Sequence, residues 1–126
     1  MRILGHGIDI IDVERIARSL QEHGERFLDR VFTKNEQAYA ADAKRRDEHL
    51  AARFAAKEAV MKALGTGWGD GIAWTDVEVV LLSTGQPTVA LHGRAAQIAA
   101  SLGITTWSLS LTHTKSTAAA SAIATG

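Results

Sequence analysis

Apolar positions recur along the chain with two different periods, which divide it into a helical half and an extended half. From Asp12 to about residue 64, apolar side chains return every three or four positions, and this spacing predicts helices. After about residue 76 they alternate with polar side chains, and this spacing predicts strands. Together with a first strand over residues 3–8, the order indicates an α+β fold.

Turn and capping residues set the limits of these elements. Asp12 is a suitable N-cap, Thr33-Lys34-Asn35-Glu36 has the form of a capping box, and Gly65 is a helix stop. The expected helices cover residues 12–22, 25–32, 33–42, 48–64 and 94–102, and the expected strands cover residues 3–8, 76–82, 88–92, 106–112 and 118–124. A long loop over residues 65–73 separates the two halves, and long loops in compact domains are often functional.

The central helix, expected over residues 48–64, carries a charge inside its apolar stripe. Lys57 falls within this stripe, and Glu58 lies at its edge. A buried ammonium is costly unless it meets an anion, so Lys57 predicts an anionic partner. The alternative is that its stem lies on apolar neighbours while its head reaches water. The stripe consists of Leu50, Phe54, Met61 and Leu64.

Composition narrows the classes of function. A length of 126 residues fits one domain, residues 1–126. Lys plus Arg and Asp plus Glu are equal at 14 each, so we expect neither nucleic acid nor membrane as a partner. The sequence has no cysteine, no long apolar run and no signal peptide in MRILGHGID, so we expect a cytoplasmic protein without disulfides or zinc–thiolate sites.

Each candidate site residue also has a purely structural interpretation. Asp9 can be a helix cap or a turn residue, and Glu58 can form a surface ion pair with Lys62 one turn further on. Structural interpretations also exist for His113, for the glycines of residues 65–67 and for the basic cluster at residues 44–46.

In combination, these residues favour phosphate chemistry. Asp9 and Glu58 are carboxylates in a chain without cysteine or metal-spaced histidine, which favours Mg²⁺ over zinc. Neighbouring lysines and the glycine-rich turn at residues 65–67 suit a pyrophosphate. Because these glycines follow a helix instead of preceding one, they do not form a P-loop.

Five segments of the sequence resemble a known family. They are Gly7-Ile8-Asp9 with Glu14-Arg15-Ile16; Phe32-Thr33-Lys34-Asn35-Glu36; Arg53-Phe54-Ala55-Ala56-Lys57-Glu58-Ala59 with Lys62; Gly65-Thr66-Gly67; and Ser108-Leu109-Ser110-Leu111-Thr112-His113-Thr114. In order and spacing, from residue 3 to residue 124, they resemble the holo-[acyl-carrier-protein] synthases, the short trimeric branch of the 4'-phosphopantetheinyl transferase superfamily. Two departures are Thr112, where the family usually has serine, and Trp68, where smaller aliphatic residues are common.

The resemblance implies a fold and a reaction. The fold is an antiparallel sheet packed against a long central helix and shorter helices, assembled as a homotrimer with active sites between subunits. The reaction transfers the 4'-phosphopantetheine group of coenzyme A to a serine of apo acyl carrier protein and releases adenosine 3',5'-bisphosphate, in fatty acid biosynthesis. The strand at residues 107–112 and the small-residue run at 118–124 are expected at the subunit interface.

The resemblance also assigns roles to residues. Asp9 and Glu58 are the expected metal ligands for Mg²⁺ and, with Lys62, the expected catalytic residues; Glu58 is also the candidate general base. Arg15 is expected to dock the acidic carrier protein, and Arg18 is added by helical spacing alone. The expected coenzyme A site comprises Lys44, Arg45, Arg53, Lys62, Gly65, Thr66, Gly67, His113 and Thr114. In this set Lys44, Arg45 and Arg53 are candidates for the 3'-phosphate, and His113 and Thr114 would come from a neighbouring subunit.

Two other functions fit parts of the sequence. One is a non-catalytic trimeric module that binds a nucleotide through the glycine turns and the basic cluster. The other is a metal-dependent phosphohydrolase. The binding module does not need Asp9 and Glu58 together, and the hydrolase does not need an exposed Arg15.

Overall fold

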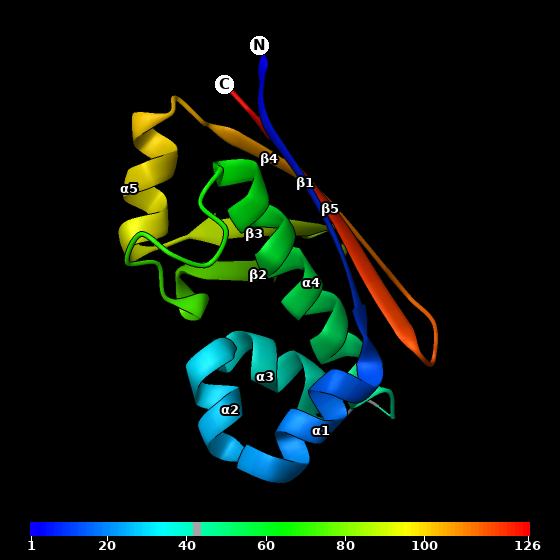
Figure 1. The fold of residues 1–126 in the computed structure, drawn as a ribbon. Helices are drawn as coiled ribbons and strands as arrows, with labels where there is room; N and C mark the ends of the chain where they lie inside the picture. Colours follow the sequence, from blue (N-terminus) through cyan, green and yellow to red (C-terminus); the bar gives the residue numbers. More distant parts are fainter. Residues whose placement is uncertain (42–43) are drawn as a thin grey trace.

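A three-stranded antiparallel sheet and a long helix across it organise the fold (Figure 1). The computed structural model describes residues 1–41 and 44–126. The strands follow the order β1 (Ile3–Asp12), β5 (Thr117–Thr125) and β4 (Thr106–His113). Helix α4 (Arg46–Leu64) lies along one face of this sheet and contacts all three strands. The α+β prediction is therefore confirmed.

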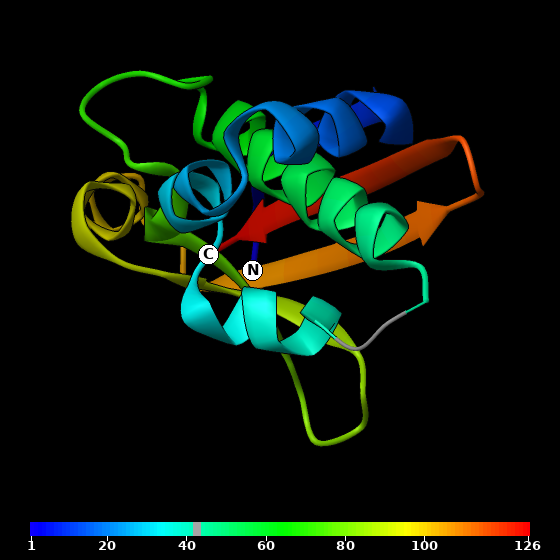
Figure 2. The ribbon, with the colours of Figure 1, turned by 90° about the horizontal axis from the view of Figure 1, so that it is seen from below.

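Shorter elements surround α4. They are α1 (Val13–His23), α2 (Glu25–Val31), α3 (Lys34–Ala41), the 3-10 turn η1 (Trp74–Asp76), the hairpin β2 (Val77–Leu81) and β3 (Pro87–Leu91), and α5 (Gly93–Ser101). In Figure 2, α4 lies between α1 and the strands β4 and β5, so it is covered on two opposite sides. None of the helices in residues 1–41 and 44–126 is long and apolar enough to cross a membrane.

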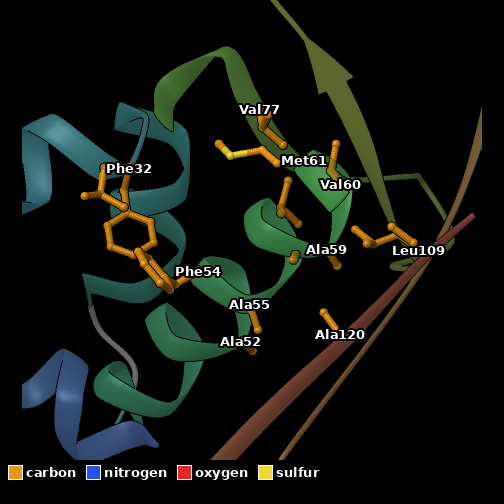
Figure 3. Close-up of a cluster of buried hydrophobic side chains, with 14 of the residues drawn as sticks. Phe32, Ala52, Phe54, Ala55, Ala59, Val60, Met61, Val77, Leu109 and Ala120 are labelled. Atoms are coloured by element: carbon orange, nitrogen blue, oxygen red, sulfur yellow. The ribbon is translucent and has the colours of Figure 1, made fainter. Parts of the chain in front are cut away.

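The predicted apolar stripe of α4 forms the centre of the core. Leu50, Phe54, Met61 and Leu64 are all buried. Figure 3 shows Phe54 on the side of Phe32, while Ala59 lies on the side of Leu109 and Ala120. Because α4 has neighbours on most of its circumference, it also buries many small residues that a single amphipathic stripe does not predict.

Two glycines let β1 lie directly on α4. A Cβ atom at Gly5 would overlap the backbone carbonyl of Ala63, and one at Gly7 would overlap the carbonyl of Ala59. Only glycine permits such an approach of two backbones. The contact places Asp9, two residues after Gly7 on the same face of β1, beside the last turns of α4.

The first strand is longer than predicted, which changes the position of Asp9. The prediction ended this strand at residue 8 and placed Asp9 after it, whereas β1 continues to Asp12 because its pairing with β5 continues to Thr117. Asp9 therefore lies inside a paired strand. The other predicted elements agree within two residues where the structure describes them. The predicted helix end at residue 42 lies outside the described residues.

The second face of the three-stranded sheet is uncovered by any of the described helices (Figure 1). Ile8 and Ile10 on this face are 62% and 71% exposed. The small-residue strand β5 divides between the two faces, because alternate alanines from Ala118 to Ala124 are buried on the α4 side. Only the side chains on the second face of β5 are free to contact a neighbouring subunit, whereas the whole run of residues 118–124 was expected to do so.

Candidate active site

The structure brings Asp9, Glu58 and Lys62 together where β1 crosses the end of α4. The Lys62 Nζ atom donates a hydrogen bond to the Asp9 Oδ1 atom at 3.2 Å and another to the Ile8 carbonyl at 3.0 Å. Glu58 lies one turn before Lys62 on the same helix, and its carboxyl group interacts with that of Asp9. Lys62 therefore pairs with Asp9 on another element, and the alternative in which it only pairs with Glu58 is wrong.

The acidic pair is crowded with negative charge. Burial raises the pKa of Glu58, the neighbouring Asp9 carboxylate raises it further, and the positive charges of Arg15 and Lys62 oppose this effect. Two adjacent carboxylates of this kind are a donor set that suits a hard divalent cation, which would relieve their repulsion. Within residues 1–41 and 44–126, no group of three or more potential metal ligands occurs. A cation held by Asp9 and Glu58 would keep positions for water and phosphate oxygens.

The glycine turn begins directly after this site. Gly65 and Gly67 have φ angles of 81° and 56°, a backbone region that favours glycine. The amide of Gly65 donates to the Lys62 carbonyl, and those of Thr66 and Gly67 donate to the Met61 carbonyl. The turn thus lies beside Lys62 as expected, but these three amides already bind the end of α4.

A basic surface hollow occupies the opposite end of α4. Lys44 and Arg45 line it together with Arg46 and Lys115, and one apolar and two acidic residues complete the lining. At 1.5 Å per residue, the thirteen residues from Arg45 to Glu58 correspond to roughly 20 Å along the helix. A nucleotide whose phosphates share one ribose is too short to reach both ends of α4 within one chain.

Arg53 lies apart from the Lys44 and Arg45 hollow. Its guanidinium stacks over the Tyr39 ring at 4.1 Å, its Nη1 atom reaches the His49 carbonyl at 3.5 Å, and burial lowers its pKa. Among the described residues, its buried Nε atom has no hydrogen-bond partner. Arg53 therefore does not line the hollow, although the charges of Arg53 and Arg45 both lower the pKa of the His49 imidazole, after burial as the main cause.

His113 and Thr114 lie near the basic hollow instead of near the acidic pair. The His113 Nδ1 atom is 3.2 Å from the Glu48 Oε1 atom, and the two imidazole rings of His113 and His49 are 5.3 Å apart. Thr114 closes the turn between β4 and β5 by accepting from the amide of Thr117 at 3.1 Å. Glu48 precedes Glu58 by ten residues, about 15 Å of helix, so within one chain these residues do not reach the acidic pair.

The anionic partner of Lys57 is Glu36, and both side chains are fully buried. The Lys57 Nζ atom is 2.8 Å from the Glu36 Oε1 atom and also donates to the carbonyls of Trp74 and Val77. Lys57 therefore meets an anion, as predicted, but the anion is part of the chain and not a ligand. The alternative in which its ammonium reaches water is wrong.

Glu36 and Glu78 were missed as buried acids. Glu36 accepts hydrogen bonds from the amides of Thr33 and Val79. The predicted capping box of Thr33 and Glu36 is therefore present, and Glu36 also binds a strand in the core. Burial acts to raise the pKa of Glu78, but hydrogen bonds from Thr33, His92 and Asn35 outweigh burial and lower it. The capping box was the only sequence signal for this cluster.

The two arginines that were expected to dock the carrier have different surroundings. The Arg15 guanidinium lies 5.3 Å over the Phe54 ring, and its charge lowers the pKa of Glu58. Arg18 forms an exposed ion pair with Glu14 at 3.7 Å. Arg15 therefore lies between the exposed face of α1 and the acidic pair, whereas the charge of Arg18 is balanced by that of Glu14.

Known proteins share both the sequence and the fold. Residues 5–121 match the family model of the 4'-phosphopantetheinyl transferase superfamily. A holo-[acyl-carrier-protein] synthase of Solibacter usitatus (strain Ellin6076) is 50% identical over 112 residues, which cover 89% of this chain and 90% of the relative. The synthase of Neisseria meningitidis superposes with a TM-score of 0.88 at 32% identity and covers 99% of this chain and 100% of its own. A synthase of Bacillus anthracis in complex with coenzyme A gives a TM-score of 0.79 at 35% identity and covers 97% and 96%.

Proposed function

The chain belongs to the 4'-phosphopantetheinyl transferase superfamily, and we propose that it works as a magnesium-dependent trimer. It transfers the 4'-phosphopantetheine group of coenzyme A to a serine of apo acyl carrier protein. The observation that supports our assignment of the active site is the convergence of Asp9, Glu58 and Lys62 at the crossing of β1 and α4.

The reaction exchanges one phosphorus–oxygen bond for another. The serine Oγ atom of the carrier bonds to the pantetheine-side phosphorus of coenzyme A, and the bond from that phosphorus to the bridging oxygen breaks. The bridging oxygen leaves with adenosine 3',5'-bisphosphate. Such transfers require mainly alignment and neutralisation of charge by the protein. Lys62 is placed to supply one positive charge to the phosphates.

Asp9 and Glu58 fit Mg²⁺ through their chemistry and their mutual repulsion. When bound, Mg²⁺ would supply charge neutralisation at the diphosphate oxygens. Glu58 is our candidate for the group that removes the proton from the carrier serine. It is the candidate because its carboxyl group, beside that of Asp9, would be within reach of both the metal and the serine.

Coenzyme A carries its diphosphate and its 3'-phosphate on one ribose, so the two groups cannot bind at opposite ends of the same α4. We assign the diphosphate to Lys62 and the glycine turn of Gly65, Thr66 and Gly67, and the 3'-phosphate to the hollow with Lys44 and Arg45 of a neighbouring subunit, the hollow beside His113. Arg53 remains a candidate because its buried Nε atom lacks a partner among the described residues.

A trimer would explain two features of the isolated chain. The uncovered sheet face exposes Ile8 and Ile10, and apolar exposure of this kind marks contact surfaces. His113 and Thr114 lie too far from the acidic pair of their own chain, so they would contribute to the coenzyme A site of a neighbouring subunit. Sedimentation equilibrium should give three times the chain mass, and a fully active monomer would contradict the proposal.

Carrier docking is assigned to the exposed face of α1. Arg15 reaches from this face toward the acidic pair, so a carboxylate of the carrier bound there would bring its serine near Glu58. Arg18 shares the face but already pairs with Glu14.

One assay tests this function against both rivals. The protein is mixed with coenzyme A, Mg²⁺ and apo acyl carrier protein, and the mass of the carrier is followed. Gain of one phosphopantetheine group is expected, and chelation of the cation should abolish it. Arg15→Glu should raise KM for the carrier more than Arg18→Glu, with KM for coenzyme A unchanged. Phosphate release without carrier modification would favour a phosphohydrolase, and binding without either reaction would favour a nucleotide-binding module.

A further inference from the structure

Three aromatic rings stack in a row from the loop after α4 into the core. Trp68 stacks on Trp74 with ring centroids 5.9 Å apart and an interplanar angle of 11°. Trp74 stacks in turn on Phe54 at 4.9 Å and 26°. Trp68 is 58% exposed, whereas Phe54 is buried, so the row begins at the surface and ends in the core.

The amides of Gly65, Thr66 and Gly67 hold the start of the loop that carries Trp68, but beyond them the loop is rich in glycine. Residues 65–73 contain four glycines, and Asp70 is a non-glycine residue with a positive φ angle of 55°. Glycine-rich backbone loses much conformational entropy when it is ordered. Ile72 is buried and the Arg94 Nε atom donates to the Asp70 carbonyl at 3.0 Å, so both contacts hold the second half of the loop. Trp68 is the large side chain of the first half.

The ring on which Trp68 stacks is itself fixed. The Trp74 carbonyl accepts a hydrogen bond from the Lys57 Nζ atom at 3.2 Å, and Lys57 is held by Glu36. Trp74 therefore belongs to the rigid part of the molecule. The stack of Trp68 on this ring connects the first half of the loop, which starts three residues after Lys62, to that rigid part.

We propose that Trp68 is a positioning residue that holds the middle of the loop, beyond the glycine turn, and thereby arranges the coenzyme A site before coenzyme A binds. The inference rests on the proposed location of that site. A loop ordered in advance lowers the entropy lost on binding. Loss of the stack should therefore weaken coenzyme A binding and leave both kcat and KM for the carrier protein nearly unchanged.

The test compares Trp68→Ala with Trp68→Phe, which keeps a ring that can stack. Trp107→Phe is the matched control, because Trp107 lies in β4 outside the row. Two neighbouring indoles produce an exciton couplet in far-ultraviolet circular dichroism when their transition dipoles are skewed relative to each other. Coenzyme A binding is measured by titration calorimetry without carrier protein, and kcat and both KM values are measured by carrier modification.

Trp68→Ala should lose the couplet and bind coenzyme A roughly three- to tenfold more weakly, the range that one aromatic stack supports. Trp68→Phe should retain most of the affinity, and Trp107→Phe should retain both couplet and affinity. Unchanged coenzyme A affinity after loss of the couplet would overturn the proposal, as would a couplet that persists in Trp68→Ala. A wild-type protein that binds coenzyme A but modifies no carrier would instead contradict the proposed function.

Discussion

Helix α4 carries two lysine–carboxylate clusters of similar composition and opposite character. The closed cluster consists of Lys57, Glu36 and Glu78, and its polar groups have hydrogen-bond partners from surrounding elements. The open cluster consists of Lys62, Asp9 and Glu58, and its acids face each other with the pKa of Glu58 raised. Residue type therefore does not distinguish a structural cluster from a functional one. The distinction lies in how many partners the fold itself supplies.

The difference follows from the burial of the two lysines. The Lys57 side chain is fully buried and binds a carboxylate and two carbonyls, so it has no capacity left for a ligand. The Lys62 side chain is 51% exposed and can turn toward a phosphate. If the comparison is correct, changes in the open cluster should reduce activity and spare stability, and changes in the closed cluster should do the reverse.

The largest effect is expected for Glu58→Gln. Loss of a base in proton transfer typically reduces rates by about 10²–10⁴-fold, and this variant also loses a proposed metal ligand. Its stability should not fall, because the amide removes the repulsion with Asp9. Carrier modification and urea unfolding measure the two quantities. A nearly normal rate would remove Glu58 from both roles.

The closed cluster should respond in the opposite way to Lys57→Met. The change leaves the Glu36 carboxylate buried without its cation, which typically costs about 3–5 kcal/mol of unfolding free energy. Lys62→Met is the matched control and should lose clearly less stability than Lys57→Met, because the Lys62 side chain is half exposed and the Lys57 side chain is fully buried. Equal loss of stability in both variants would erase the distinction between the clusters.

The smallest effect is a dependence of stability on pH in the metal-free protein. The pKa of Glu58 is raised above its ordinary value of 4.5, so the folded state binds this proton more tightly than the unfolded state. Stability should therefore fall as pH rises from about 4.5 through the raised pKa, and it should stay lower above it. Thermal unfolding at several pH values in chelator measures this slope. Glu58→Gln should flatten the slope, and a slope that persists in this variant would assign it to other groups.

The periodic parts of the fold were predictable from the sequence, and the partners of buried charges were not. Leu50, Phe54, Met61 and Leu64 are buried as their spacing indicates. That Lys57 needs an anion was also predictable, but nothing in the local sequence pairs it with Glu36, because long-range pairing depends on how α3 and α4 pack. The length of β1 was underestimated because its last residues pair with a strand more than 100 positions away.

In the candidate active site, too, contacts between residues distant in the sequence could not be predicted. The resemblance named Asp9, Glu58 and Lys62, and the structure brings them together. It did not predict that Arg53 is buried against Tyr39, nor that Trp68 stacks on Trp74, because both contacts join separate parts of the chain. Spacing along one helix is readable from sequence, whereas contacts between elements require the fold.

The contact of Gly5 and Gly7 with α4 has a consequence for how this protein can vary. Because backbone meets backbone, no side chain between β1 and α4 sets the spacing of Asp9 and Glu58. Substitutions that enlarge or shrink other core residues change stability but leave the backbone contact between β1 and α4 intact. Substitutions elsewhere in the core should therefore lower the melting temperature before they reduce the catalytic rate.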